Sequence, residues 1–173
     1  MSKLAPVPYD FLPEVPWLTV GSDDLIEGER LPEEHVFDDW GMKGGNLSPQ
    51  LRWSGAPEGT RSYAVTCFDP DAPTGSGFWH WLLYDLPASI TQIPTGAGGS
   101  GTLLGLQAKN DYGTKEYGGA APPPGQPHRY LFAVHALGVE SIGVDSDSSA
   151  AVVGFNITAN TLARGYLTVV YEV

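Results

Sequence analysis

Glycine and proline interrupt this chain so often that no long regular helix fits into it. The 173 residues include 22 glycines and 15 prolines, and short apolar or alternating runs lie between them. Alternation with a period of two is typical of a β-strand, and Gly and Pro mark the turns that separate strands. Many short strands joined by turns predict a mainly β fold, an antiparallel β-sandwich. We expect strands at residues 17–20, 51–53, 62–68, 78–85, 130–137 and 166–171.

One helix is expected near the C-terminus of the sequence. Ser148 or Ser149 is suited to cap its start, and Gly165 is suited to end it. Residues at helical spacing form one apolar stripe, which we expect to face the core. The members of this stripe are Val152, Phe155, Ala159 and Leu162.

The composition predicts one globular domain, residues 1–173, with an acidic surface. There are 9 Lys and Arg residues against 20 Asp and Glu, which gives a formal net charge of −11. This balance argues against binding to nucleic acid and against broad docking on anionic membranes. His35 lies in an acidic, loop-like stretch, and we expect both it and the carboxylates around it to be solvated. These carboxylates belong to Asp23, Asp24, Glu27, Glu29, Glu33, Glu34, Asp38 and Asp39.

No segment of the sequence resembles a membrane anchor or a secretion signal. A transmembrane helix needs about 18 or more apolar residues in a row, and no such run is present. We therefore expect a cytoplasmic protein without membrane insertion. Cys67 is the single cysteine, so no internal disulfide can form, and its place in a strand-like run predicts a small buried side chain. Residues 96–101 match Gly-x-Gly-x-x-Gly, but they lack the flanking strand and helix of a dinucleotide site.

A rigid acidic turn followed by a histidine is the first candidate for a functional site. Pro70 and Pro73 fix their own φ angles and keep Asp69 and Ala72 out of the helical region. His80 follows shortly afterwards, flanked by tryptophans. This arrangement is suited to one wall of a polar pocket. From these residues alone, a hairpin connection with a histidine satisfied inside the protein is an equally good interpretation.

A second proline-rich loop, at residues 121–127, also leads to a histidine at the start of a strand. Side chains alternate along a strand, so His128 and Tyr130 lie on the same face. Two stiff loops built to the same plan predict a single site made from two places in the chain.

Several motifs, taken together and in order, resemble the phosphatidylethanolamine-binding protein family. The resemblance is to its bacterial and archaeal branch, often called Raf-kinase-inhibitor-like proteins. It extends from about residue 46 to about residue 137 and implies a Greek-key β-sandwich with a few short helices, which agrees with the strand pattern. The motifs are Asp-Pro-Asp-Ala-Pro at 69–73, Gly-Phe-Trp-His-Trp at 77–81, Pro-Pro-Pro-Gly at 122–125 and His-Arg-Tyr at 128–130, with further likeness at 46–53 and 109–113.

The resemblance implies a small surface pocket for phosphate, acetate or a phosphoryl head group. It implies no catalytic residue, no cofactor and no bound metal. Imidazole N–H and phenol O–H groups are donors suited to an oxyanion, and the carboxylate of Asp69 can fix a histidine tautomer and favour the charged ring. We therefore expect a cationic histidine in the pocket. The ligand-binding residues implied are Asp69, Asp71, Pro73, Phe78, His80, Ala121, Pro122, Pro123, His128 and Tyr130.

The function expected from this resemblance is non-enzymatic binding of a phosphoryl group on a lipid such as phosphatidylethanolamine, or on a phosphorylated partner. Regulation of a kinase or protease through protein contacts is the alternative. A metal-dependent hydrolase built on Asp69, Asp71, His80 and His128 is a third hypothesis, although their spacing matches no specific metal pattern. The bacterial branch often forms dimers, which implies a possible homodimer.

Overall fold

Strands dominate the architecture of this protein. The computed structural model describes residues 4–101 and 104–173. Its helical segments are two short 3-10 turns, η1 (Pro8–Phe11) and η2 (Glu33–His35), and one α-helix, α1 (Ala150–Asn160). Its strands are β1 (Thr19–Gly21), β2 (Leu51–Ser54), β3 (Ser62–Asp69), β4 (Phe78–Pro87), β5 (Gln92–Ile93), β6 (Leu106–Gln107), β7 (His128–Leu137) and β8 (Thr161–Tyr171).

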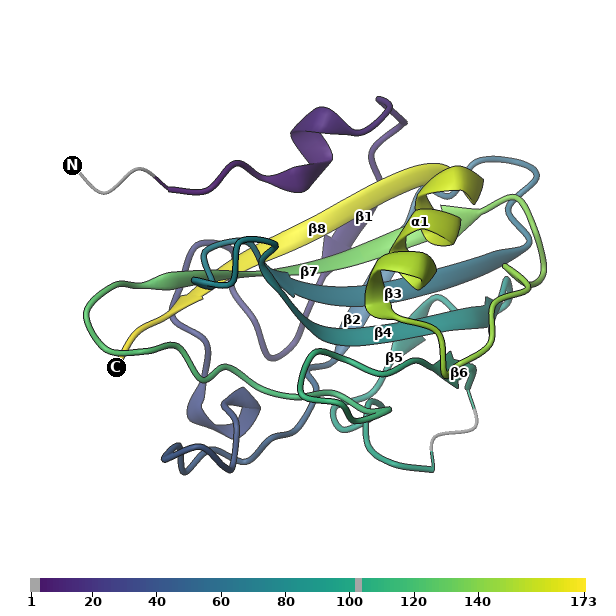
Figure 1. Ribbon diagram of the computed structural model, residues 1–173. Helices are drawn as coiled ribbons and strands as arrows, with labels where there is room; N and C mark the ends of the chain where they lie inside the picture. Colours follow the sequence, from purple (N-terminus) through teal and green to yellow (C-terminus); the bar gives the residue numbers. More distant parts are fainter. Residues whose placement is uncertain (1–3, 102–103) are drawn as a thin grey trace.

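The strands form two antiparallel sheets. The larger sheet has the order β6-β4-β3-β7-β8, and the smaller one has the order β1-β2-β5. The helix α1 lies across one face of the larger sheet, and the smaller sheet lies on the side away from α1 (Figure 1). The prediction of a mainly β, antiparallel architecture with few short helices is therefore confirmed. The strands β5 and β6, of two residues each, were not predicted because two residues carry no period.

The central strand β3 is buried on both faces, and it separates two hydrophobic clusters. Val65 and Cys67 belong to the cluster between the sheets. Ala64 belongs to the other cluster, together with Leu82 from β4 and Val153 from α1. Cys67 is 1% exposed, as expected, and burial raises the pKa of its thiol well above the usual value. The sheet is therefore covered on both sides, by β-strands on one and by α1 on the other.

The start of α1 follows the sequence prediction. Ser149 has an extended conformation and accepts a hydrogen bond at Oγ from the backbone N–H of Val152, at 3.3 Å. Ser149→Ala should lower the free energy of unfolding by about 1 kcal/mol, because one N–H of the first turn loses its acceptor. Urea unfolding of the variant measures this loss. Ser148→Ala is the matched control and should stay within about 0.5 kcal/mol of the wild type; an equal loss in both variants would contradict the assignment of Ser149 as the cap.

The predicted apolar stripe of α1 is wrong. The buried residues of the helix are Ala150, Val153 and Ile157. Val152 and Phe155, which were expected to face the core, are 47% and 74% exposed. Both sets have helical spacing, so periodicity does not distinguish between them. The buried set brings Gly154 next to the ring of Trp79, where an added Cβ would lie only 3.3 Å from the indole.

The prediction that Gly165 ends the helix is wrong, because Gly165 lies inside β8. The helix ends at Asn160 and the strand begins at the next residue. A Cβ on Gly165 would overlap with the carbonyl oxygen of Leu18. Its neighbour Arg164 forms a parallel bridge with Trp17. The glycine is therefore needed where the N-terminal segment crosses close to β8.

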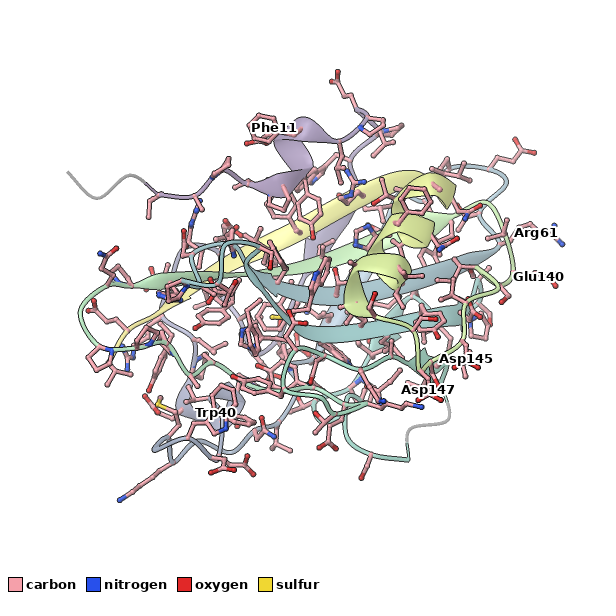
Figure 2. All side chains as sticks on the ribbon, viewed as in Figure 1. Phe11, Trp40, Arg61, Glu140, Asp145 and Asp147 are labelled. Carbon is pink, nitrogen blue, oxygen red and sulfur yellow. The ribbon has the colours of Figure 1, made fainter. Side chains whose placement is uncertain are left out.

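Four large aromatic side chains in the described part of the chain remain on the surface, those of Phe11, Trp17, Trp40 and Phe155. Phe11 is 76% exposed and Trp40 is 64% exposed, and Figure 2 shows them in separate regions of the molecule. In the part of the chain that the structure describes, no helix is long and apolar enough to cross a membrane.

The strand pairing brings the two proline-rich loops together. Asp69 at the end of β3 pairs with Phe78 at the start of β4. On the other side of β3, Phe68 pairs with Leu131 near the start of β7. The loops at 70–77 and 121–127 therefore meet at one end of the larger sheet (Figure 1).

Candidate functional site

A small pocket lies at this end of the larger sheet. Its volume is about 150 Å³, which is room for about five water molecules at roughly 30 Å³ each. It can hold a small polar group but no long acyl chain. Of the residues predicted for the site, all but Asp71 line the pocket. The lining consists of Trp40, Asp69, Ala72, Pro73, Thr74, Phe78, His80, Tyr112, Ala121, Pro122, Pro123, His128 and Tyr130.

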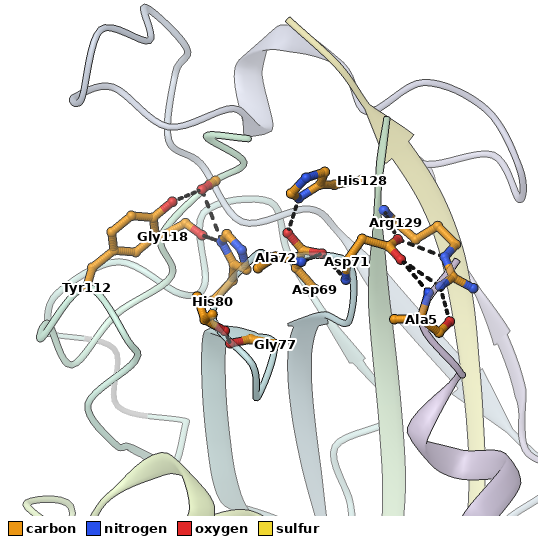
Figure 3. A network of polar contacts seen from close by, with 12 residues as sticks. Ala5, Asp69, Asp71, Ala72, Gly77, His80, Tyr112, Gly118, His128 and Arg129 are labelled. Carbon is orange, nitrogen blue, oxygen red and sulfur yellow. Dashed lines mark hydrogen bonds and ion pairs between the residues drawn. The ribbon is translucent and has the colours of Figure 1, made fainter. Parts of the chain in front are cut away.

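A buried carboxylate orients one of the two pocket histidines. Oδ2 of Asp69 lies 2.7 Å from Nδ1 of His128, and Oδ1 accepts the backbone N–H groups of Asp71 and Ala72 at 2.7 and 3.1 Å (Figure 3). Burial raises the pKa of Asp69, and the hydrogen bond with His128 offsets part of this effect. The carboxylate thus occupies Nδ1 of His128, and Nε2 is the nitrogen that remains to meet a ligand.

The second pocket histidine, His80, is neutral at physiological pH. Its Nδ1 lies 2.8 Å from the carbonyl oxygen of Gly118 and 3.1 Å from that of Gly119 (Figure 3). Carbonyl groups only accept hydrogen bonds, so Nδ1 carries the proton and Nε2 is an acceptor. Burial lowers the pKa of His80 to about 4. The expected cationic histidine is therefore not His80, whose partners are backbone carbonyls and not Asp69.

Tyr130 contributes a buried hydroxyl group that has no partner. Its oxygen has no hydrogen bond among the residues that the structure describes. Burial, followed by the nearby charge of Asp69, raises the pKa of Tyr130, so the hydroxyl keeps its proton. The rings of Tyr130 and Tyr112 pack edge-on against His80, with centroids at 5.1 and 5.5 Å. In contrast to Tyr130, Tyr112 donates its hydroxyl hydrogen to the carbonyl oxygen of Gly119, at 2.8 Å.

Asp71, although predicted to bind ligand, lies outside the pocket lining and is held by Arg129. The guanidinium of Arg129 donates to both carboxylate oxygens at 2.8 Å, and its backbone N–H donates at 2.9 Å (Figure 3). Partial burial acts against ionisation of Asp71, but the bonds from Arg129 outweigh it and lower the pKa. None of the residues that line the pocket is Lys or Arg. The cation next to the site is thus directed away from it.

Four lining residues were not predicted from the sequence. Ala72 and Thr74 belong to the acidic turn or follow it directly. Tyr112 lies in the segment 109–113, whose likeness to the family was noted, so that motif could have revealed it. Trp40 carries no local signal. Ring packing places it in the wall, with its centroid 4.7 Å from Tyr112 and 6.5 Å from Phe78.

The two other histidines lie outside the pocket and are buried. The expectation that His35 is solvated is wrong, because it is 0% exposed. His135 has the structural role that its place in mid-strand indicates: it lies 3.1 Å from the hydroxyl of Thr66 and accepts a bond from Arg164 at 3.4 Å. Burial lowers the pKa of His135 to about 3.

The pocket offers no metal site. Over residues 4–101 and 104–173, the carboxylate and imidazole groups of Asp69, Asp71, His80 and His128 do not bring three ligand atoms close enough to share an ion. The hypothesis of a metal-dependent hydrolase on these four residues therefore has no geometric support.

Comparison with known proteins agrees with the fold and the motifs. Residues 21–172 match the model of the family described as phosphatidylethanolamine-binding protein. The UPF0098 protein YbcL of Escherichia coli K12 is 51% identical over 159 residues, which cover 89% of this chain and 87% of YbcL. The UPF0098 protein YbhB of the same organism is 48% identical over 154 residues, covering 87% of this chain and 98% of YbhB.

Solved structures show the same fold. The crystal structure of E. coli YbcL, described as a new member of the mammalian PEBP family, has a TM-score of 0.87 at 49% identity and covers 90% of this chain and 98% of its own. A homologue from Chlamydia trachomatis, CT736, has a TM-score of 0.77 at 23% identity, over 91% of this chain and 98% of its own. This chain therefore belongs to the phosphatidylethanolamine-binding protein family.

Proposed function

We propose that this protein binds, without chemical turnover, a small oxyanion such as phosphate or the phosphoryl end of a larger molecule. The observation that carries this proposal is the hydroxyl of Tyr130, which is buried in the lining of the pocket and has no partner among the described residues. A buried polar group without a partner costs about 1–3 kcal/mol. An oxygen atom of a ligand that accepts the Tyr130 hydrogen would remove this cost.

The charges around the pocket favour an oxyanion that still carries a proton. Among residues 4–101 and 104–173, no Lys or Arg lines the site, and the carboxylate of Asp69 lies within it. The neutral His80 offers an acceptor at Nε2, whereas Tyr130 offers a donor. A phosphate monoanion has both kinds of group, since its P–OH can donate to His80 while its oxygens accept from Tyr130. A dianion would place a second charge close to Asp69 with no fixed cation to offset it.

The rim of the pocket is stiff before any ligand arrives. Pro73, Pro122 and Pro123 are part of the lining, and each ring fixes one backbone angle. Less ordering on binding means less lost entropy, which favours a small ligand that makes few contacts. The volume of the pocket fits the phosphoryl group itself, so that any lipid tail or polypeptide attached to it stays outside.

Tyr130→Phe should weaken phosphate binding and stabilise the ligand-free protein. A hydrogen bond to a charged group contributes about 1.5–3 kcal/mol, so the dissociation constant should rise by roughly 10- to 100-fold. Without phosphate, removal of an unpaired buried hydroxyl should raise the free energy of unfolding by up to about 1 kcal/mol. NMR titration at about pH 6 measures the first effect, and urea unfolding in phosphate-free buffer measures the second.

Tyr166→Phe is the matched control, because it removes a tyrosine hydroxyl outside the pocket lining. It should bind phosphate as the wild type does. Phosphoethanolamine is titrated in parallel with phosphate. Tighter binding of phosphoethanolamine would indicate a lipid head group as the ligand, and tighter binding of phosphate would indicate the free anion. Saturable shifts should gather around Asp69, His80, His128 and Tyr130. No shift in the wild type, or equal affinity in Tyr130→Phe, would refute the proposal.

Regulation of a kinase or protease is the second candidate function. The feature in its favour is Trp40, which lines the pocket and is 64% exposed (Figure 2). Exposed tryptophan is frequent among residues that dominate protein interfaces. A phosphorylated protein would then place its phosphoryl group in the pocket while its surface covers Trp40. Loss of partner binding in Trp40→Ala, with unchanged affinity for free phosphate, would distinguish this function from binding of the small anion alone.

A further inference from the structure

His35 has an unsatisfied nitrogen atom deep inside the protein. The side chain is 0% exposed, at the end of the 3-10 turn η2. Its Nδ1 lies 2.7 Å from the carbonyl oxygen of Leu47. Because a carbonyl only accepts, Nδ1 carries a hydrogen, so the ring presents a lone pair at Nε2 whenever Nε2 holds no proton. This Nε2 has no hydrogen-bond partner in the described part of the chain.

Two carboxylates surround this nitrogen. Oε1 of Glu34 lies 3.4 Å from Nε2 of His35, and Oδ2 of Asp24 lies 4.0 Å from it. One ligand atom from each of the three residues lies within 4.8 Å of the other two. When Nε2 holds no proton, three groups that carry lone pairs thus face one another. A positive ion at their centre would turn this repulsion into attraction.

The spacing of the three groups suits a metal ion. Zinc binds imidazole nitrogen and carboxylate oxygen at about 2.0–2.2 Å, so two tetrahedral ligand atoms lie roughly 3.4 Å apart. The Glu34–His35 distance has this value, and the Asp24–His35 distance needs only a small closure. The hydrogen bond from Nδ1 to a carbonyl is the usual way in which a protein orients a metal-binding histidine.

The surroundings of Asp24 also hold its carboxylate in place. Its Oδ2 accepts the backbone N–H of Gln50 at 2.7 Å and the hydroxyl of Thr95 at 2.5 Å. Residues from three separate loops therefore converge here. The side chain of Asp24 is 19% exposed and that of Glu34 is 56% exposed, which gives an ion a path from solvent. The net charge of −11 attracts cations to the surface.

We propose that Asp24, Glu34 and His35 bind a divalent transition-metal ion of the zinc type. The set of one imidazole and two carboxylates leaves a fourth position for water or for an outside ligand. None of the three residues lines the phosphoryl pocket, so this site is independent of the function proposed above. Bound metal would tie the segment after β1 to η2 and stabilise the folded state by mass action.

Zinc titration of the metal-stripped full chain, without an affinity tag, tests this proposal. Calorimetry should give saturable binding of one Zn²⁺ per chain, and the ¹⁵N shift of His35 Nε2 should move while Nδ1 keeps its hydrogen. Glu34→Gln should weaken binding by at least about 10-fold. Because Glu34 is largely exposed, this variant should fold normally, as circular dichroism would show.

Glu33→Gln is the matched control, since it makes the same change of charge in the same 3-10 turn. It should bind zinc as the wild type does. Asp24→Asn should lose affinity like Glu34→Gln. Absence of saturable binding, equal affinity in Glu33→Gln and Glu34→Gln, or shifts at His80 and His128 instead of His35 would each overturn the proposal.

Discussion

Asp71→Ala is expected to lower the free energy of unfolding by about 3–5 kcal/mol. Removal of one partner from a buried ion pair leaves the other charge without compensation, which accounts for a loss of this size. The side chains of Asp71 and Arg129 are 8% and 17% exposed. Asp71 also accepts the backbone N–H of Ala5 at 3.3 Å, so the variant loosens the N-terminal segment as well. Urea unfolding of the variant measures the loss.

Asp147→Ala provides the matched control for this prediction. Asp147 pairs with Lys115 at 2.8 Å, the same distance as in the Asp71 pair, but the side chain of Asp147 is 69% exposed. Solvent screens such a pair, so its removal should leave stability close to that of the wild type. If Asp71→Ala lowers the free energy of unfolding no more than Asp147→Ala does, then the Asp71–Arg129 pair does not anchor the acidic turn.

Acidification from about pH 7 to about pH 5 is expected to destabilise the protein. The pKa values of His80 and His135 in the folded protein are about 4 and about 3, against 6.5 for a histidine exposed in the unfolded chain. Between these values and pH 6.5, the unfolded chain binds protons that the folded chain does not, so stability falls as the pH falls. At about pH 5, the free energy of unfolding should be lower by roughly 2 kcal/mol for each histidine, or by roughly 4 kcal/mol for the two together.

Urea unfolding at about pH 7 and about pH 5 measures this loss. Asp69 acts in the opposite direction, because burial raises its pKa and its contribution is lost as the pH rises. The comparison of wild type with His135→Gln isolates one histidine, since the carboxylates are common to both. His135→Gln should show a pH dependence smaller by up to about 1.4 kcal/mol per pH unit. Identical pH dependence in the two proteins would contradict the assigned protonation of His135.

Much of the site follows from local chemistry that can be read along the chain. Prolines fix the turn at 69–73 whatever surrounds it. Strand alternation places His128 and Tyr130 on one face, and both do line the pocket. The helix cap at Ser149 is a similar case, because a cap involves only neighbouring residues. In contrast, the face that α1 buries was mispredicted, since two apolar sets share the same spacing and the partner sheet selects between them.

Local patterns along the chain were enough to predict the longer strands, the turns and the residues that the two proline-rich loops deliver, because backbone angles and side-chain alternation depend on immediate neighbours. The choice of pairing partners and of charged groups depends on contacts that form on folding. Asp71 meets Arg129, 58 positions away, and so leaves the pocket lining. His80 is neutral because burial lowers its pKa, even though its Nδ1 meets the carbonyls of Gly118 and Gly119, and His35 is buried beside its neighbour Glu34 and the more remote Asp24. Burial and pKa depend on atoms from remote segments, and folding alone brings these together.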